Sequence, residues 1–294
     1  MPRLTAKDFP QELLDYYDYY AHGKISKREF LNLAAKYAVG GMTALALFDL
    51  LKPNYALATQ VEFTDPEIVA EYITYPSPNG HGEVRGYLVK PAKMSGKTPA
   101  VVVVHENRGL NPYIEDVTRR VAKAGYIALA PDGLSSVGGY PGNDDKGREL
   151  QQQVDPTKLM NDFFAAIEFM QRYPQATGKV GISGFCYGGG VSNAAAAYPE
   201  LACAVPFYGR QAPTADVAKI EAPLLLHYAE LDSRINEGWP AYEAALKANN
   251  KVYEAYIYPG VNHGFHNDST PRYDKSAADL AWQRTLKWFD KYLS

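Results

Sequence analysis

The 294-residue chain is poor in cysteine, with only Cys186 and Cys203. Two cysteines cannot build a disulfide framework, and a bridge between them would tie a glycine-rich turn to a predicted buried strand, so we expect two free thiols. The chain also lacks an excess of basic residues, since 30 Lys and Arg stand against 33 Asp and Glu. Because nucleic-acid binders need a positive surface, we expect no DNA or RNA partner.

Long apolar runs are missing as well. The most apolar stretch near the N-terminus, residues 37–48, spans about 12 residues and is flanked by Lys36 and Asp49. A membrane-spanning helix needs about 20 residues, so we expect no stable membrane anchor. Hydrophobic residues nevertheless make up 46% of the chain, which is enough to build a large buried core.

Residues 1–60 admit two interpretations. In the first, SKREFL at 26–31 resembles a twin-arginine export motif, ALA at 56–58 provides a cleavage site, and the protein is exported to the periplasm. In the second, Ser26 caps a helix, Glu29 completes a capping box, and the segment is a folded helical arm of a cytoplasmic protein. The sequence leaves leader and arm open. The tyrosine-rich segment LLDYYDYYAHG also predicts a contact surface, and a homodimer through it is one possibility.

From residue 61 onward, short β-rich runs alternate with helical stretches. The apolar runs TPAVVVVHE (98–106) and YIALAPD (126–132) are typical of strands covered on both faces. Residues 83–92 alternate and predict an antiparallel edge strand. The pattern predicts one α/β catalytic domain over residues 61–294, with a mainly parallel sheet and helices on both faces, preceded by the N-terminal helical segment. Reactive groups gather at the carboxyl ends of such strands.

The segment GFCYG places Cys186 between two glycines, Gly184 and Gly188. This spacing matches the nucleophile elbow of α/β hydrolases, with cysteine in place of serine. A nucleophile on a tight strand-to-helix turn needs glycine neighbours, because side chains there would collide with adjacent strands. Gly189 and Gly190 are expected to let the following helix pack closely, and its N-terminus favours a thiolate. The competing interpretation is a small apolar residue packed at a turn.

Further candidates follow other predicted strands. Asp232 and His263 come after Cys186 in the order nucleophile, acid, histidine that α/β hydrolases share. The histidine can accept the thiol proton, and the aspartate can fix its tautomer. Glu106 ends a buried strand near the expected thiol. The Glu106 carboxylate can accept the proton of that thiol. We expect the backbone N–H groups of Asn107 and Tyr187 to form an oxyanion hole.

The remaining histidines carry weaker signals. His227 lies inside an apolar strand, which is typical of a core residue, and His22 and His81 have polar or glycine-rich neighbours. His266 stands three residues after His263, but no set of carboxylates or cysteines accompanies the pair. We therefore expect no metal and no other cofactor. Cys203 begins an apolar strand and is expected to be inert.

Together these segments resemble the dienelactone hydrolase family, which is carboxymethylenebutenolidase-like, over about residues 70–294. The resemblance rests on GFCYGG, HENRGLN, APDGL at 130–134, AELD and NHGF. It implies an α/β-hydrolase fold and a triad of Cys186, His263 and Asp232. It also implies that Glu106 is the partner of the resting thiol and that substrate binding moves it to deprotonate the cysteine. The implied activity is hydrolysis of a small-molecule ester or lactone.

The resemblance is incomplete at the substrate-binding positions. Family members that act on dienelactone hold its carboxylate with two arginines, and this chain has Ser136 and Asn267 at those positions. Arg108 and Arg210 lie on loops expected at the same crevice and are candidates to replace them. Tyr140 is a further candidate for the pocket wall.

Three functions are compatible with these residues. The first is a cysteine hydrolase of small esters or lactones. The second is a thioesterase or peptidase on the same fold, and the third is a non-enzymatic assembly protein with an α/β-hydrolase-like fold. A nucleophile, an acid and a base in the required order favour an enzyme, because a binding module has no need for all three.

Overall fold

The computed structural model describes residues 3–294. Its eight strands are β1 (Ile68–Ser77), β2 (Gly82–Pro91), β3 (Thr98–Val104), β4 (Ile127–Pro131), β5 (Ala176–Phe185), β6 (Cys203–Phe207), β7 (Leu224–Ala229) and β8 (Tyr253–Tyr258). They form one sheet in the order β1-β2-β4-β3-β5-β6-β7-β8. The pairs from β4 to β8 are parallel, and β2 is antiparallel to both of its neighbours. The predicted α/β class is confirmed.

Strand β3 is apolar and buried from Ala100 to Val104. Val101 and Val103 contact the hydrophobic cluster on one face of the sheet, and Val102 and Val104 contact the cluster on the other. Both faces of this part of the strand are covered, which explains its continuous apolar sequence. Strand β2 is antiparallel as predicted, but it is not an edge strand, because β1 pairs along its outer side.

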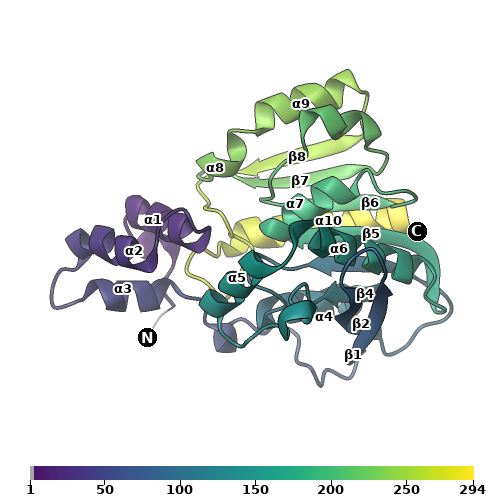
Figure 1. Cartoon of the computed structure of the whole chain (residues 1–294), viewed down its shortest axis with the longest axis horizontal. Coiled ribbons are helices and arrows are strands. Elements are labelled where there is room, and N and C mark those ends of the chain that lie inside the picture. Colours follow the sequence, from purple (N-terminus) through teal and green to yellow (C-terminus); the bar gives the residue numbers. More distant parts are fainter. Residues whose placement is uncertain (1–2) are drawn as a thin grey trace.

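Helices cover both faces of this sheet, as Figure 1 shows. They are α4 (Pro112–Lys123), α5 (Asp144–Gln153), α6 (Pro156–Gln171), α7 (Tyr187–Ala195), α8 (Ser233–Asn236), α9 (Trp239–Ala248) and α10 (Lys275–Leu293). The cluster on one face takes residues from α6, α7 and α9, and the cluster on the other takes residues from α4 and α10.

Residues 3–58 form a helical lobe, here called the N-terminal arm. Its helices are α1 (Gln11–Ala21), α2 (Lys27–Ala34) and α3 (Ala44–Leu51). The Ser26 hydroxyl accepts from the Glu29 N–H and the Glu29 carboxylate accepts from the Ser26 N–H, which is a complete capping box. The helical conformation ends at Tyr37, and Gly40 and Gly41, with φ values of 63° and 86°, form the turn that leads to α3. Thr43 then caps α3.

The arm has an aromatic core of its own, made of Tyr17, Tyr20, Phe30 and Phe48. The ring centroids of Phe30 and Phe48 lie 5.5 Å apart, and those of Tyr20 and Phe48 lie 5.2 Å apart. Two tyrosines of the tyrosine-rich segment are therefore buried inside the arm, and a homodimer through this segment stays a prediction. Within residues 3–294, no helix has both the length and the apolar character needed to span a membrane.

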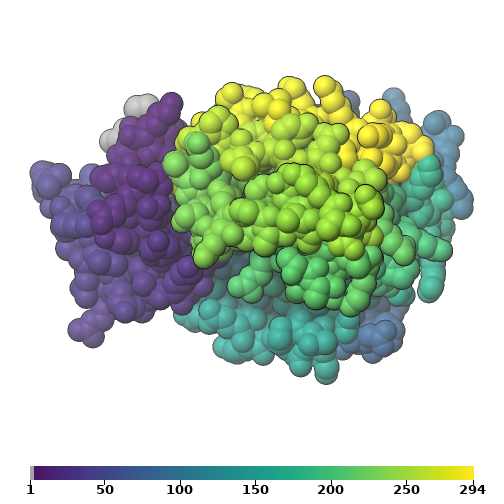
Figure 2. Space-filling model, turned by 90° about the horizontal axis from the view of Figure 1, so that it is seen from above, coloured from purple at the N-terminus to yellow at the C-terminus, as the bar shows by residue number. Residues whose placement is uncertain are grey.

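The arm lies against the catalytic domain at the side where α5 and α8 are found, and Figure 2 shows the purple lobe in contact with the rest of the molecule. The last carbonyl groups of a helix have no partner within it. In α1 the carbonyl oxygens of Tyr20 and Ala21 accept from side chains of Arg148 (3.2 Å) and Asn107 (2.8 Å). The C-terminal end of α1 is thus fixed by the catalytic domain.

We expect Phe30→Ala to unfold the arm while the sheet stays folded. Removing a fully buried phenylalanine costs about 3–5 kcal/mol, a large loss for a core of this size. Hydrogen–deuterium exchange should show loss of protection in residues 3–58 and unchanged protection in β3 and β5. Leu33→Ala is the control, since Leu33 is 37% exposed. Equal exchange in both variants would contradict the importance of this core.

Candidate active site

Cys186 alone forms the turn between β5 and α7. Its φ and ψ are 56° and −110°, a backbone conformation that residues with a side chain rarely adopt. Its N–H donates to the carbonyl oxygen of Phe207 at 3.0 Å, which fixes the turn to β6. A Cβ on Gly184 would overlap the carbonyl of Gly188, and a Cβ on Gly188 would overlap the carbonyl of Val104. Both glycines are therefore required by contact, as the elbow spacing predicts.

The next two glycines differ from each other. A Cβ on Gly189 would lie 2.5 Å from the carbonyl oxygen of Phe207, so the predicted close packing is confirmed there. A Cβ on Gly190 would meet its nearest atom at 3.7 Å, which is ordinary van der Waals contact. The expectation for Gly190 was wrong, because that side of α7 faces a cavity and not the sheet.

Asp232 and His263 are brought together at the ends of β7 and β8. His263 Nδ1 lies 2.5 Å from Asp232 Oδ2, and both side chains are buried. Because the carboxylate can only accept, Nδ1 carries a proton. Within residues 3–294, His263 Nε2 has no hydrogen-bond partner. Ring nitrogens of His263 and His22 and the Cys186 sulfur all lie within 4.8 Å of one another.

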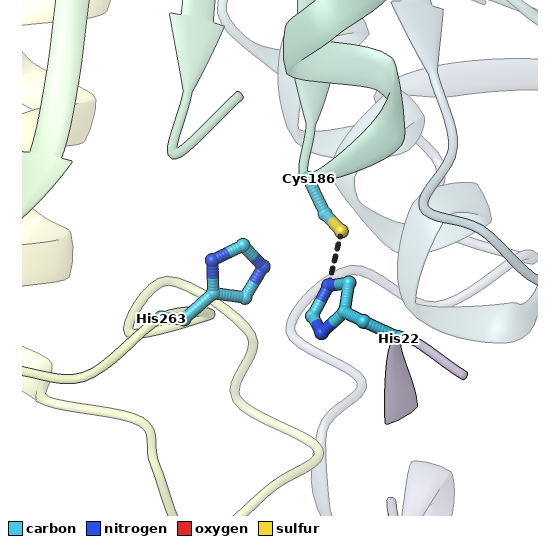
Figure 3. Close-up of side chains that lie close together, drawn as sticks. All are labelled: His22, Cys186 and His263. Carbon is cyan, nitrogen blue, oxygen red and sulfur yellow. Dashed lines mark hydrogen bonds between the residues drawn. The ribbon is translucent and has the colours of Figure 1, made fainter. Parts of the chain in front are cut away.

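His22, at the C-terminal end of α1, points directly at the thiol, as Figure 3 shows. Its Nε2 lies 3.2 Å from Cys186 Sγ. Its Nδ1 lies 2.8 Å from the carbonyl oxygen of Asp18 and 3.2 Å from Asp18 Oδ1. Burial lowers the pKa of His22, but the negative charges of Asp18 and Cys186 outweigh it and raise the pKa above its usual value. The neighbours of His22 in the sequence did not predict this position at the site.

Two arginines complete the surroundings of His22. Arg234 Nη2 lies 3.1 Å from His22 Nε2 and 3.2 Å from His263 Nδ1, and its Nε donates to Asp18 at 3.2 Å. Arg272 Nη1 donates to the other oxygen of Asp18 at 3.3 Å. Burial raises the pKa of Asp18, but the interactions with His22 and Arg272 outweigh it and bring the pKa well below its usual value. Asp18 is therefore a carboxylate.

These residues differ in how far the sequence predicts them. Arg234 follows Asp232 by two positions, so a site that contains Asp232 is also expected to contain Arg234 nearby. Asp18 and His22 are four residues apart, which puts them on one face at the end of a helix. No local pattern, however, shows that this helix end docks on the elbow, so their role could not be predicted.

The sulfur and the two imidazoles are spaced as side chains that share a metal ion would be. The Arg234 guanidinium, 3.1 Å from His22 Nε2, brings a positive charge against this group and opposes a bound cation. We therefore assign no metal ligands here. The same guanidinium favours negative charge on the sulfur.

Glu106 is buried but bonded elsewhere. Its Oε2 accepts from Asn267 Nδ2 at 3.1 Å and lies 4.0 Å from Arg108 Nε. Within the described residues, the hydrogen bond to the Cys186 sulfur comes from His22. The expected contact between the resting thiol and Glu106 is thus replaced by a contact with the arm.

A cavity of about 370 Å³ opens over Cys186 and is mainly apolar. Asn107 and Tyr187, the two expected oxyanion-hole residues, both line it, and so do Arg210 and Arg234. The other lining residues are His22, Met160, Cys186, Gly190, Val191, Ala194, Tyr208, Gln211, Ala212, Pro213, Ile235 and His263.

The other substrate-binding candidates lie outside this cavity. Arg108 and Tyr140 line a second cavity of about 200 Å³ between the arm and α5, where they bind Asp144 at 3.3 Å and 2.8 Å. Ser136 is exposed on the surface, and Asn267 is buried against Glu106. Among the five candidates, Arg210 alone is placed beside the thiol.

Two further predictions are confirmed, the core position of His227 and the two free thiols. His227 is buried in β7 between the hydroxyls of Tyr258 (2.9 Å) and Thr285 (3.1 Å), and burial lowers its pKa to about 3. Both cysteines are free thiols. Cys203 is the first residue of β6, and burial raises the pKa of its thiol.

A parallel sheet with a cysteine at a strand-to-helix elbow, and a buried Asp–His pair at later strand ends, defines an α/β hydrolase. The chain belongs to the dienelactone hydrolase family, whose sequence model matches residues 84–293. A second family model, described as YqhI-like, matches residues 1–36. The two matches therefore fall separately on the arm and on the catalytic domain.

Similar proteins agree with this family. The chain is 33% identical over 236 residues to a "Putative carboxymethylenebutenolidase" of Synechocystis sp., covering 74% of this chain and 95% of that protein. It is 99% identical over 116 residues to "Putative hydrolase fragment YghX" of Escherichia coli (strain K12), which covers 40% of this chain and 99% of the fragment. A crystal structure titled as a "Putative Dienelactone Hydrolase" from Klebsiella pneumoniae superposes with a TM-score of 0.70 at 28% identity. The superposition covers 76% of this chain and 99% of that one.

The elbow contacts predict opposite effects for two glycines of α7. Gly188→Ala forces a Cβ into the backbone of β3 and should lower the free energy of unfolding by about 2 kcal/mol or more. Gly190→Ala has room and gains helix propensity, so it should raise stability by up to about 1 kcal/mol. Urea denaturation of the two variants measures this difference. Equal losses in both would show that the close approach at Gly188 is not the limiting contact.

Proposed function

We propose that this dienelactone-hydrolase-like enzyme hydrolyses small carboxylic esters or lactones through Cys186 as nucleophile, with His263 as base and Asp232 as the acid that orients it. The observation that carries the proposal is the combination at the elbow. A strained cysteine lies beside an imidazole whose Nδ1 is bound by Asp232 at 2.5 Å and whose Nε2 is free. Within residues 3–294, the Nε2 of this histidine makes no hydrogen bond that would give it a structural role, and it can transfer protons.

In the first half of the reaction, the proton of the Cys186 thiol passes to His263 Nε2 and the sulfur attacks the carbonyl carbon of the substrate. A C–S bond forms and the carbonyl π electrons move to oxygen. The oxyanion is held by the N–H groups of Tyr187, at the N-terminus of α7, and Asn107. When the intermediate collapses, the C–O bond of the ester breaks and the leaving alkoxide takes a proton from protonated His263, giving a thioester on Cys186.

In the second half, His263 removes a proton from water, and the hydroxide attacks the thioester carbonyl. The C–S bond breaks, the carboxylic acid leaves and the sulfur returns as a thiolate or thiol. Asp232 holds the Nδ1 proton of His263 throughout and stabilises the imidazolium formed in each half. Because attack on a thioester by water ends in the free acid, no other co-reactant is required.

The cavity supports a small and mainly apolar substrate. Its volume of about 370 Å³ fits a molecule of modest size, and most of its wall is hydrocarbon. The two positions at which the resemblance implies carboxylate-binding arginines, Ser136 and Asn267, do not line it. Arg210, which is exposed at the rim, is the residue we assign to a polar group on the substrate. An uncharged ester or lactone is therefore the substrate class we favour over dienelactone.

Cys186→Ala is expected to abolish hydrolysis of p-nitrophenyl acetate, because no other nucleophile lies at the elbow. Asp232→Asn should lower kcat by about 10²–10⁴-fold, since the imidazole loses its orienting carboxylate. Steady-state release of p-nitrophenol measures both effects.

Cys203→Ala is the matched control, because this thiol is buried in β6 away from the cavity, and its activity should stay near that of the wild type. Acid quenching of wild-type turnover followed by mass spectrometry should place an acetyl group on Cys186. A Cys186→Ala variant as active as the wild type would end the covalent mechanism.

A further inference from the structure

We infer that His22 of the N-terminal arm is a second catalytic histidine, which holds Cys186 as a thiolate in the resting enzyme and so takes the place that the family resemblance gives to Glu106. The inference deepens the proposed function and rests on it for the role of the sulfur as nucleophile. Its structural basis is the hydrogen bond between His22 Nε2 and Cys186 Sγ at 3.2 Å.

The proton positions follow from the partners of the ring. Both atoms near His22 Nδ1, the carbonyl oxygen and a carboxylate oxygen of Asp18, can only accept, so Nδ1 must carry a proton. The remaining proton of the pair is then shared between Nε2 and Sγ. When it lies on Nε2, the result is an imidazolium beside a thiolate, which is how histidine activates cysteine in other enzymes.

The charges around the pair favour this ionic form. Asp18 is a carboxylate and stabilises a positive His22 from the side opposite to the sulfur. Arg234 lies against both imidazoles; its positive charge stabilises a negative sulfur and opposes a positive His22, and the Asp18 carboxylate on the other side of the ring counters that repulsion. Arg272 and Arg234 together neutralise Asp18, so the carboxylate does not cancel the field at the thiol. Although burial lowers the pKa of His22, Asp18 and Cys186 raise it above its usual value, which is the direction that favours the protonated ring.

The two histidines then have separate tasks. His22 has its Nε2 on the sulfur and keeps the nucleophile ionised between turnovers. Within residues 3–294, His263 Nε2 has no hydrogen-bond partner and Nδ1 is on Asp232. The proton shared by His22 and the sulfur passes to His263 as the sulfur attacks, so that His263 can give it to the leaving alkoxide and then take one from water. Glu106 is bonded elsewhere, since its Oε2 accepts from Asn267 and lies near Arg108.

Alkylation of Cys186 by iodoacetamide tests the inference without any substrate. The full-length protein is used, with its intact mass showing that residue 22 is present, and the rate is measured from pH 5 to pH 10. We expect His22→Gln to move the midpoint of the pH profile upward by about one unit or more, and to slow alkylation at pH 6.5 about tenfold or more. Cys203 does not interfere, because it is buried.

Three further variants make the result specific. Asp18→Asn keeps the ring and removes the supporting charge, so it should move the midpoint in the same direction by a smaller amount. Lys24→Gln removes an exposed charge two residues from His22 and should leave the midpoint in place. Glu106→Gln should move the midpoint less than His22→Gln does. Circular dichroism checks that each variant keeps its helices, and Asp18→Asn remains informative if His22→Gln does not fold.

Two outcomes would overturn the inference. An unchanged midpoint in both His22→Gln and Asp18→Asn would show that His22 does not set the ionisation of the thiol. Faster alkylation at every pH with the same midpoint would show that His22 only shields the sulfur. Failure of the proposed function looks different, because a wild type that hydrolyses no ester can still show the His22-dependent midpoint.

Discussion

The backbone of Cys186 is the constraint on which the rest of the site depends. A single residue with φ of 56° joins β5 to α7, and this holds its side chain at the carboxyl edge of the sheet. The turn persists only because Gly184 and Gly188 leave room for backbone to meet backbone and because β6 accepts the Cys186 N–H. Strain of this kind costs about 1–3 kcal/mol and survives where the surrounding structure over-determines it. The sheet, the glycines and α7 supply that support.

The N-terminal arm is a second structural unit, and the end of its helix α1 lies at the Cys186 thiol. Its aromatic core fixes the direction of α1, and side chains of the catalytic domain bind the last carbonyl groups of that helix. A helix end that would otherwise need water is thereby held over the thiol, with Asp18 and His22 one turn apart on it. The site is consequently shared between two units that match different family models.

Much of the catalytic domain can be predicted from the sequence because the patterns that define it are local. The glycines around Cys186, the continuous valine run of β3 and the order of Asp232 and His263 each depend on neighbours in the chain. Residues whose role depends on the docking of the arm on the catalytic domain could not be predicted. His22 looks like any histidine beside a glycine until α1 is placed against the elbow, and Arg108 turned out to face Asp144 and not the thiol. The sequence also did not predict strand β1, so the predicted edge strand β2 is in fact an inner strand.

Asn267 connects the two departures of this chain from its family. The resemblance implies an arginine at this position for a substrate carboxylate, and the asparagine instead donates its amide to Glu106. Asn267 thus replaces one of the two carboxylate-binding arginines that the resemblance implies. It also binds Glu106, the residue that the resemblance implies must move. With Glu106 held by Asn267, the mechanism that we propose needs another group to ionise the thiol, and it assigns this role to His22, with Arg234 beside it. In that mechanism the thiol does not depend on a carboxylate of the substrate, in keeping with the uncharged esters and lactones that we favour.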